Sequence, residues 1–405
     1  MSIQIISFFS QVSPEGLSSE VLGGLDQEGV TVLNREDKIP KDVPTFIFIG
    51  TGGTENDVAQ FLDINNLDQP ILLLSYDERN SLPAAMEIRA YLQQKGMASR
   101  IIHKPLNQLK ELLAKWAQYY KVKEMLRSTK IGIVGEPSSW LIASNVDYEL
   151  VAKRWGVEFK KIPISELSMK IETSLDANFS ERIKTFRSKA KCQNVTDEAV
   201  EKAGIVAQRL NEIREKNELA AITVQCFQLL QDTNISGCYA LSYLNDIESF
   251  VAGCEGDIPA TFTMLLAKML TGTPSFMANV ASVDQSFNTA VFAHCTVPTG
   301  IADEYEITNH FETGLSVGIR GSLPLTDVTI VKVFGEDLSK YWISSGTIID
   351  NLVNDKGCRT QIRVALDESV DYFLEESLAN HHIIILGDHV EAFTDFFDFM
   401  EQVSG

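Results

Sequence analysis

The feature that most constrains the fold of this chain is the alternation of apolar, β-rich runs with helical segments over its first two thirds. The runs Ile3–Phe9, Thr45–Ile49 and Gln69–Ser75 each precede a helix-like stretch. Strands of a parallel sheet read as continuous apolar runs because both faces are buried, and a crossover helix joins one strand to the next. The alternation therefore predicts a parallel α/β sheet at the start of the chain.

A second α/β unit follows the long helical pattern Leu106–Arg127, and a β-rich region follows that unit. The second unit contains the apolar runs Lys130–Val134, Glu158–Ile162 and Ala220–Gln225. After Val283 short β-rich runs dominate: Val291–His294, Tyr305–Phe311, Leu315–Ile319, Asp327–Phe334, Tyr341–Ile349, Gln361–Ala365 and Ile383–Leu386. We predict two Rossmann-like parallel α/β domains, residues 1–127 and 128–285, and a C-terminal domain, residues 286–405, formed by an antiparallel sheet or barrel and a last helix.

The segment Asn80–Gly96 carries the signals of a helix with both ends marked. Ser81 is a good N-cap residue, Pro83 falls in the first turn, and Gly96 follows the last apolar position. We therefore expect a helix here that Ser81 caps.

Composition and charge restrict the class of partner. The 405 residues are 44% hydrophobic and 22% charged, as in an ordinary folded protein. The net charge of -20 repels phosphate backbones and anionic lipids, so we expect no nucleic-acid or membrane partner, whereas a small neutral substrate is compatible. The N-terminus lacks the pattern of a signal peptide, which predicts a cytoplasmic protein. The six cysteines lie far apart without a CxxC pair, which favours free buried thiols.

The turn Cys254–Asp257 is the strongest candidate for chemistry. It follows the β-type run Phe250–Cys254 and opens a helix, with Asp257 as the expected N-cap and Pro259 in the first turn. Glu255 thus lies just past the carboxyl end of a parallel strand, where open α/β sheets place their binding crevice. A carboxylate there can hold a divalent cation or act as a base. Either acidic side chain can instead simply favour the helix N-terminus, and for Asp257 that is the preferred interpretation.

The histidines of the last third are the second candidate group. Only His103 precedes residue 290, and the others are His294, His310, His381, His382 and His389. His381 and His382 alternate across a strand edge, so we expect at most one of them to bind a given ion. For any single histidine here, a surface or hydrogen-bonded structural role is the commoner outcome, and His310 and His389 are the first candidates for it. Carboxylate and imidazole ligands together suit Mn²⁺, Fe²⁺, Co²⁺ or Zn²⁺.

Two turns that follow strands are weaker candidates for the lining of a crevice. Thr51–Glu55 could hold a phosphate at a helix N-terminus, but it lacks the glycine spacing and the lysine of known phosphate loops, so an ordinary tight turn is favoured. Gly135–Trp140 occupies the equivalent place in the second unit, with ordinary turn chemistry as the alternative.

Several stretches resemble the fucose/arabinose isomerase superfamily, and most closely its shorter, fucose isomerase-related branch. The specific matches are Cys254–Ala260, Leu270–Met277 and Ala293–Pro298, in that order. Asn80–Ala85, Gly135–Ser139 and His381–His389 extend the resemblance over nearly the whole chain. The resemblance implies two Rossmann-like units followed by a β-rich domain, and a homo-oligomer, a trimer or hexamer, with its sites near subunit contacts.

The resemblance also implies roles for individual residues. Glu255 matches the acidic metal ligand and base, His294 matches a histidine ligand, and His381 or His382 matches a late histidine ligand. Ala278 and Asn279 stand where the family has its second acidic ligand. Asn279 offers only a neutral oxygen, and Asp284 is a candidate substitute.

We therefore predict an aldose-ketose isomerase that acts on a monosaccharide through a metal-stabilised enediolate, with Mn²⁺ as the expected metal. The expected catalytic residues are Glu255 and His294, the expected metal ligands Glu255, His294 and His381, and the expected substrate contacts Asn279, Asp284 and His382. Two alternatives stay open: a sugar-acting enzyme of this fold without a tightly bound metal, and a non-catalytic sugar-binding protein.

Overall fold

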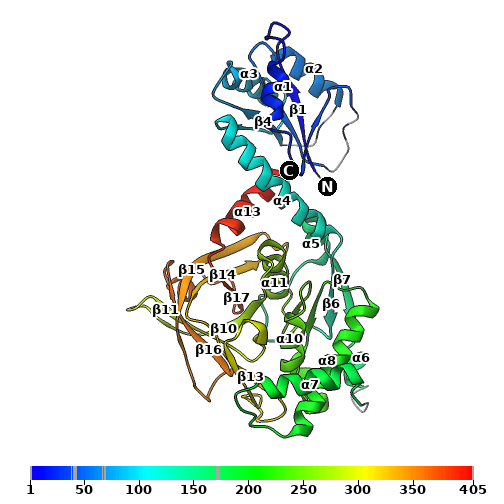
Figure 1. Ribbon diagram of the computed structural model, residues 1–405, viewed down its shortest axis with the longest axis vertical. Coiled ribbons are helices and arrows are strands. Elements are labelled where there is room, and N and C mark those ends of the chain that lie inside the picture. The colour runs from blue at the N-terminus through cyan, green and yellow to red at the C-terminus, as the bar shows by residue number, and fades with distance from the viewer. Residues whose placement is uncertain are drawn as a thin grey trace. The chain divides into compact units, whose positions relative to one another are not determined.

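The computed structural model describes residues 2–37, 39, 43–65, 67, 70–169 and 174–403. The chain divides into two compact units, Met1–Met125 with Thr394–Gly405, and Leu126–Phe393 (Figure 1). Two parallel α/β sheets and a closed antiparallel barrel build these units, which confirms the predicted fold class. The division into three domains stays a prediction. Within the part of the chain that the structure describes, no helix is both long and apolar enough to cross a membrane.

The first unit contains a five-stranded sheet of order β2-β1-β3-β4-β5 in which neighbouring strands are parallel. Its strands are β1 (Ile3–Phe8), β2 (Val30–Leu33), β3 (Thr45–Ile49), β4 (Ile71–Ser75) and β5 (Ser99–His103). Its helices are α1 (Leu17–Gly23), α2 (Glu55–Asn65), α3 (Ser81–Gln94) and the start of α4 (Leu106–Arg127). Gln69, where we expected the third apolar run to begin, lies outside the described residues. Buried side chains of the strands, such as Ile47 and Leu73, pack against Val58 of α2 and Ile88 of α3.

Helix α3 forms as predicted, but Ser81 is not its N-cap. The N-cap residue is Asn80, which has a φ of 55° and makes no side-chain cap hydrogen bond. The Ser81 hydroxyl instead donates to the carbonyl of Ile49, at 2.5 Å, and accepts the N–H of Tyr76. A contact with the end of strand β3 has replaced the local cap.

The C-terminal helix α13 (Val390–Val403) contributes its residues from Thr394 onward to the first unit. The ring of Phe399 packs against Trp116 of α4 at 5.9 Å, and Trp116 stacks on Phe46 of β3 at 5.1 Å. Lys115 and Asp395 add an ion pair of 3.1 Å between the two helices. The end of the chain therefore packs with its beginning.

The second unit begins with a parallel sheet of order β7-β6-β8-β9. Its strands are β6 (Lys130–Val134), β7 (Glu158–Ile162), β8 (Ala221–Val224) and β9 (Val251–Gly253). The helices of this region are α5 (Tyr148–Trp155), α6 (Ser165–Ser168), α7 (Ala177–Lys189), α8 (Asp197–Lys216), α9 (Cys226–Thr233), α10 (Cys238–Asn245) and α11 (Ile258–Thr271).

The barrel closes in the order β10-β11-β16-β15-β14-β17, with β17 paired to β10, and neighbouring strands are antiparallel. Its strands are β10 (Ser275–Asp284), β11 (Thr289–His294), β14 (Asp327–Phe334), β15 (Lys340–Asn351), β16 (Thr360–Leu366) and β17 (His382–Leu386). A separate hairpin joins β12 (Glu304–Thr308) to β13 (Gly318–Ser322), and the short helices are η1 (Thr299–Ile301) and α12 (Tyr372–Glu375). The barrel takes β10 from residues before the expected boundary at 285.

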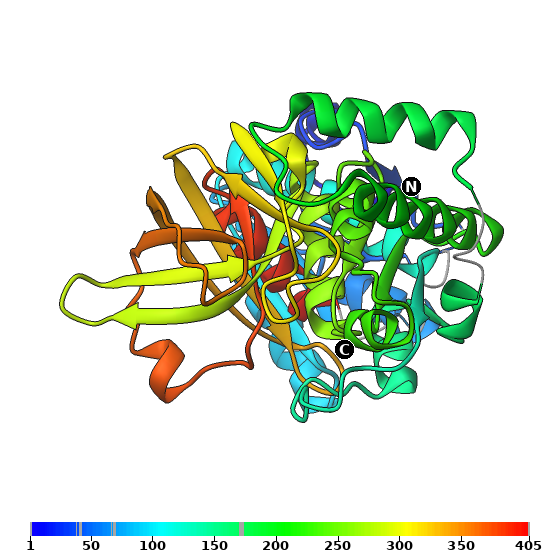
Figure 2. The same cartoon turned by 90° about the horizontal axis from the view of Figure 1, so that it is seen from below.

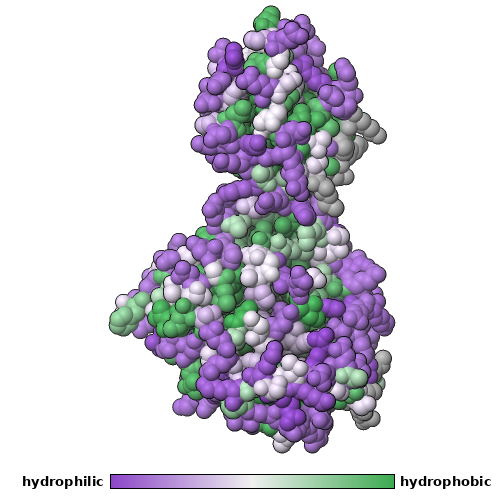
Figure 3. All heavy atoms as spheres, viewed as in Figure 1, coloured by the Kyte–Doolittle hydropathy of each residue, from purple (hydrophilic) through white to green (hydrophobic). Residues whose placement is uncertain are grey.

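Helix α11 connects the parallel sheet to the barrel. Residues 258–267 are all buried, and the helix packs on β8 and β9 of the sheet and on β10, β14 and β17 of the barrel. Figure 2 shows the barrel strands on one side of the second unit and the green helices on the other. The N-terminus of α11 therefore lies where these two layers meet. Hydrophilic residues cover much of the face shown in Figure 3, in keeping with the net charge of -20.

Candidate metal centre and cavity

The turn from β9 into α11 holds Glu255 in a constrained conformation. Glu255 and Gly256 have φ values of 62° and 70°, the left-handed region that favours glycine. A Cβ on Gly256 would lie 2.6 Å from the Cα of Pro137, so the turn and the segment Gly135–Trp140 touch too closely for any other residue. The Ser138 N–H donates to the Glu255 carbonyl at 2.9 Å. The two segments that we expected to share a crevice are thus joined directly.

The Glu255 carboxylate is buried, with 8% of the residue exposed. Its Oε2 accepts the indole N–H of Trp140 at 2.6 Å, and its Oε1 lies 3.5 Å from Nε2 of His381. Burial raises the pKa of this carboxyl, but His381 and the other nearby donors outweigh burial and leave the pKa below its ordinary value. The carboxylate is therefore ionised and keeps one oxygen directed toward the histidine.

His381 is fully buried and is oriented by Asp257. Its Nδ1 donates to Oδ2 of Asp257 at 2.9 Å, so Nε2 is the nitrogen that faces Glu255. Nε2 is buried and has no hydrogen-bond partner among the described residues, since 3.5 Å is too long for a good hydrogen bond to Glu255. Burial by itself lowers the pKa of His381, but the two carboxylates raise it to about 9, so a metal bound at Nε2 has to displace a proton from this ring. A histidine held by a carboxylate with its second nitrogen unpaired is a common arrangement in metal sites.

His294, the last residue of β11, completes the group. Burial lowers its pKa to about 4, so its imidazole is neutral at neutral pH, the form that binds metals. Its Nδ1 lies 2.8 Å from the hydroxyl of Thr296, which leaves Nε2 available as a ligand. Glu255, His294 and His381 each offer one ligand atom, and these atoms lie within 4.8 Å of one another. One carboxylate oxygen and two imidazoles fit a divalent cation such as Mn²⁺, Fe²⁺, Co²⁺ or Zn²⁺.

Asp257 is both a cap and a partner of His381. Its Oδ1 accepts the N–H of Ala260 at 2.8 Å, which confirms the expected N-cap, while Oδ2 holds His381. Burial raises its pKa, but the charge of Lys332 and the contact with His381 lower it to about 2. Lys332 on β14 is fully buried, and its Nζ has no hydrogen-bond partner among the described residues. No sequence signal pointed to Lys332, because a single lysine in a strand normally faces solvent.

His382 faces away from His381. It lies in an aromatic cluster with Trp342, Tyr372 and Phe373, at ring separations of 5.2–5.7 Å. Its Nδ1 donates to the carbonyl of Asn380 at 2.9 Å, and its Nε2 accepts the hydroxyl of Tyr372 at 3.1 Å. The structure thus puts His382 in the barrel interior and outside the cavity described next.

Two members of the triad, Glu255 and His294, line a cavity of about 430 Å³ within the second unit, and His381 is not part of this lining. Its lining is Trp140, Cys226, Phe227, Leu230, Ser236, Gly237, Cys238, Cys254, Glu255, Asn279, His294, Cys295, His310, Phe311, Glu312, Cys358 and Asn380. Asn279 is therefore in place to meet a ligand, and its Oδ1 accepts the side-chain N–H of Asn380. Asp284 is not in the lining. It is exposed at the far end of β10, where it accepts the N–H groups of Ser286 and Phe287.

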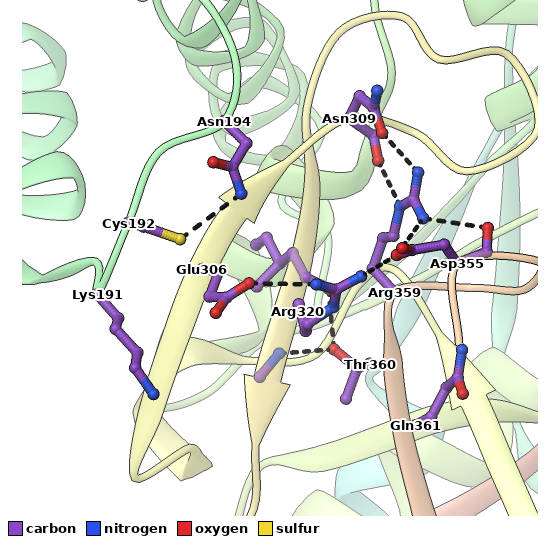
Figure 4. A network of polar contacts seen from close by, with 12 residues as sticks. Lys191, Cys192, Asn194, Glu306, Asn309, Arg320, Asp355, Arg359, Thr360 and Gln361 are labelled. Atoms are coloured by element: carbon purple, nitrogen blue, oxygen red, sulfur yellow. Dashed lines mark hydrogen bonds and ion pairs between the residues drawn. The ribbon is translucent and has the colours of Figure 1, made fainter. Parts of the chain in front are cut away.

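Two arginines that are not part of the cavity lining are held in a network of polar contacts (Figure 4). The guanidinium of Arg359 donates to the backbone and side-chain oxygens of Asn309, at 2.9 and 2.5 Å. Arg320 donates to Asp355 at 2.5 Å, and the backbone N–H of Arg359 donates to the sulfur of Cys295 at 3.4 Å. Both guanidinium groups are thus committed to the protein, and the described lining contains no lysine or arginine.

Comparisons with known proteins point to one kind of enzyme. No family model matches the chain. It is 22% identical over 298 residues to sulfoquinovose isomerases of Priestia aryabhattai and Priestia megaterium, which covers 70% of this chain and 65% of each relative. A Clostridium protein of the same name is 23% identical over 250 residues, 60% of this chain and 52% of the relative. This chain therefore spans less than two thirds of the length of these relatives. It is similar to sugar isomerases.

The residues that sequence reasoning missed are those whose role depends on distant neighbours. Trp140 was noted only as the end of a turn, yet its indole holds the Glu255 carboxylate. Cys226, Cys238 and Cys358 carried no motif, yet they line the same cavity as Cys254 and Cys295. The histidines outside the triad are spread out: His310 lines the cavity, His103 contacts Ser75 in the first unit, and His389 contacts the Leu386 carbonyl.

Proposed function

We propose that this protein is an aldose-ketose isomerase for an uncharged monosaccharide, with Glu255, His294 and His381 as the ligands of a divalent metal. The observation that carries the proposal is that the ligand atoms of these three residues, far apart in sequence, lie within 4.8 Å of one another. Two of the three, Glu255 and His294, also line one cavity. The similarity to proteins named sulfoquinovose isomerase supports the reaction class. Mn²⁺ is the proposed metal, as a borderline ion that accepts both oxygen and imidazole ligands.

The reaction removes a proton from the carbon beside a carbonyl and returns it to the neighbouring carbon. Glu255 is suited to both transfers, because its carboxylate is ionised and Trp140 holds only one of its oxygens. Bound to this triad, a divalent cation supplies a Lewis acid that stabilises the charge of the enediolate. Asp257 keeps His381 in the required orientation, and Asn279 with Asn380 offers polar groups to sugar hydroxyls.

The charge of the cavity distinguishes among sugars. The sulfoquinovose named in the relatives carries a sulfonate, and a buried anion needs a cation or several N–H donors. The described lining holds two carboxylates, Glu255 and Glu312, and no lysine or arginine. We therefore expect turnover of neutral aldoses and no turnover of sulfoquinovose. A kcat/KM for sulfoquinovose equal to or above that for every neutral aldose tested would contradict this substrate class.

The catalytic assignment is tested with Glu255→Gln, which keeps an acceptor for Trp140 but removes the base. We expect kcat to fall by about a thousandfold, since a lost general base typically has an effect of this order. Exchange of the C2 proton with deuterated solvent, followed by NMR, reports the proton transfer directly. Glu136→Gln is the control, because Glu136 is exposed and paired loosely with Lys161 at 3.7 Å. Unchanged exchange in folded Glu255→Gln would reject the assignment.

A sugar-acting enzyme that needs no tightly held metal is a second candidate, and Asn279 favours it. In the described cavity lining no carboxylate beyond Glu255 and Glu312 offers a further ligand, and Asn279 is engaged by Asn380. Activity measured before and after removal of divalent metal separates the two candidates. Full activity in metal-free protein would favour the second candidate, and activity restored by Mn²⁺ alone would favour the first.

A further inference from the structure

Five of the six cysteines, distant from one another in sequence, gather around one cavity. Cys226, Cys238, Cys254, Cys295 and Cys358 line it, and Cys192 does not. All six are free thiols. A cysteine packed in a core is an inert small hydrophobe, whereas these five border a space that a small solute can enter.

The sheet topology brings two of these thiols into contact. Strands β8 and β9 are parallel neighbours with Thr223 opposite Gly253. Cys226 begins α9 shortly after β8, and Cys254 directly follows β9, so both leave the same edge of the sheet. The Cys254 thiol donates to the Cys226 sulfur at 3.1 Å. A disulfide requires about 2.05 Å, so the two sulfur atoms need to approach by only about 1 Å.

We propose that Cys226 and Cys254 form a reversible disulfide on exposure to a peroxide, and that this bond weakens metal binding at Glu255. The second half of this inference rests on the proposed function. One sulfur attacks hydrogen peroxide, the O–O bond breaks, and a sulfenic acid and water form. The second sulfur then attacks the sulfenic sulfur, the S–O bond breaks, and a second water leaves with the remaining thiol proton. The two sulfurs lose two electrons, the peroxide gains them, and a dithiol reductant reverses the change.

A bond between Cys226 and Cys254 would form next to Glu255. Cys254 is its chain neighbour, in a turn already held by hydrogen bonds from Gly256 N–H to Val224 and from Ser138 N–H to Glu255. That anchored turn makes Cys226, at the start of the short helix α9, the partner that moves.

The next residue of α9 carries the movement to the metal site. Phe227 packs edge-on against Trp140, with ring centroids 5.0 Å apart. The Trp140 indole holds Oε2 of Glu255 at 2.6 Å. A shift of the start of α9 therefore displaces the group that orients the carboxylate.

The test treats the reduced full-length protein with one equivalent of hydrogen peroxide, blocks the remaining thiols and maps the peptides. We expect a Cys226–Cys254 cross-link, a loss of two free thiols, and recovery of both with dithiothreitol. Calorimetric titration with Mn²⁺ alone is expected to show a Kd about tenfold weaker in the oxidised protein, the scale of losing an outer contact to a ligand.

Two variants control the test. Cys226→Ser should form no cross-link, and its Mn²⁺ affinity should not respond to peroxide. Cys192→Ser, which removes the thiol outside the cavity, should behave as the unmodified protein does.

A cross-link between other cysteines, or oxidation to sulfinic acid without a cross-link, overturns the proposed pair. Equal Mn²⁺ affinity in both redox forms overturns the effect on the metal. If the reduced protein binds no Mn²⁺, the metal centre is wrong, while the peptide map still decides the disulfide.

Discussion

Asp257 has two roles that sequence analysis treats separately: it caps a helix and it orients a histidine. One oxygen accepts the Ala260 N–H and the other accepts Nδ1 of His381. We expect Asp257→Asn to weaken Mn²⁺ binding by about tenfold to a hundredfold, because its amide cannot hold the ring in the same way. Calorimetric titration measures the affinity. Asp246→Asn is the control, since Asp246 also accepts a backbone N–H, that of Gly300, but does not line the cavity. A lower melting temperature with unchanged Mn²⁺ affinity would show a purely structural role.

His382 makes stability depend on pH. Burial lowers its pKa from 6.5 to about 3, so the folded protein keeps the ring neutral where the unfolded chain binds a proton. Its contribution to stability is present above pH 6.5 and is lost as pH falls toward 3. Below pH 6.5 we expect the free energy of unfolding to fall less steeply in His382→Gln than in the unmodified protein. The two slopes should differ by about 1 kcal/mol per pH unit. Urea unfolding at several pH values measures this, and parallel slopes would contradict it.

At the scale of elements, α11 ties the parallel sheet to the barrel. The Thr263 hydroxyl donates to the Pro259 carbonyl at 2.7 Å and accepts the N–H of Val333 in β14 at 3.0 Å. Thr263→Val keeps the shape but leaves a buried N–H unpaired, so we expect a loss of about 1–3 kcal/mol in the free energy of unfolding. Thr271→Val, at the partly buried end of the same helix, is the control. Equal losses in the two variants would contradict a special role for this contact.

At the scale of the whole molecule, the metal site belongs to one of two compact units. All three candidate ligands lie in the unit Leu126–Phe393. Mn²⁺ at about a hundred times its Kd should stabilise the folded state by about 2.7 kcal/mol. We expect hydrogen exchange to slow within Leu126–Phe393, around residues 254–257, 294 and 381, and to stay unchanged in β1 to β4. Equal slowing in both units would indicate another binding site.

How much the sequence revealed differs with the kind of feature. The alternation of β-rich runs with helical segments predicted the parallel sheets, and the succession of short β-rich runs predicted the antiparallel region, because each pattern depends on local periodicity. The carboxyl end of β9 and the clustered histidines indicated the candidate ligands. Ser81 shows where local reasoning fails, since the rule for helix caps ignores the nearby end of β3 that uses its hydroxyl.

The sequence by itself determined the order of the elements and the residue types available for chemistry, because propensity and side-chain chemistry belong to each residue. Only the tertiary structure decided that His381 rather than His382 lies beside Glu255, that Asp257 holds His381, and that five thiols surround one cavity. These are contacts between residues far apart in the chain. They are fixed by strand register and by barrel closure, which no local stretch of sequence encodes.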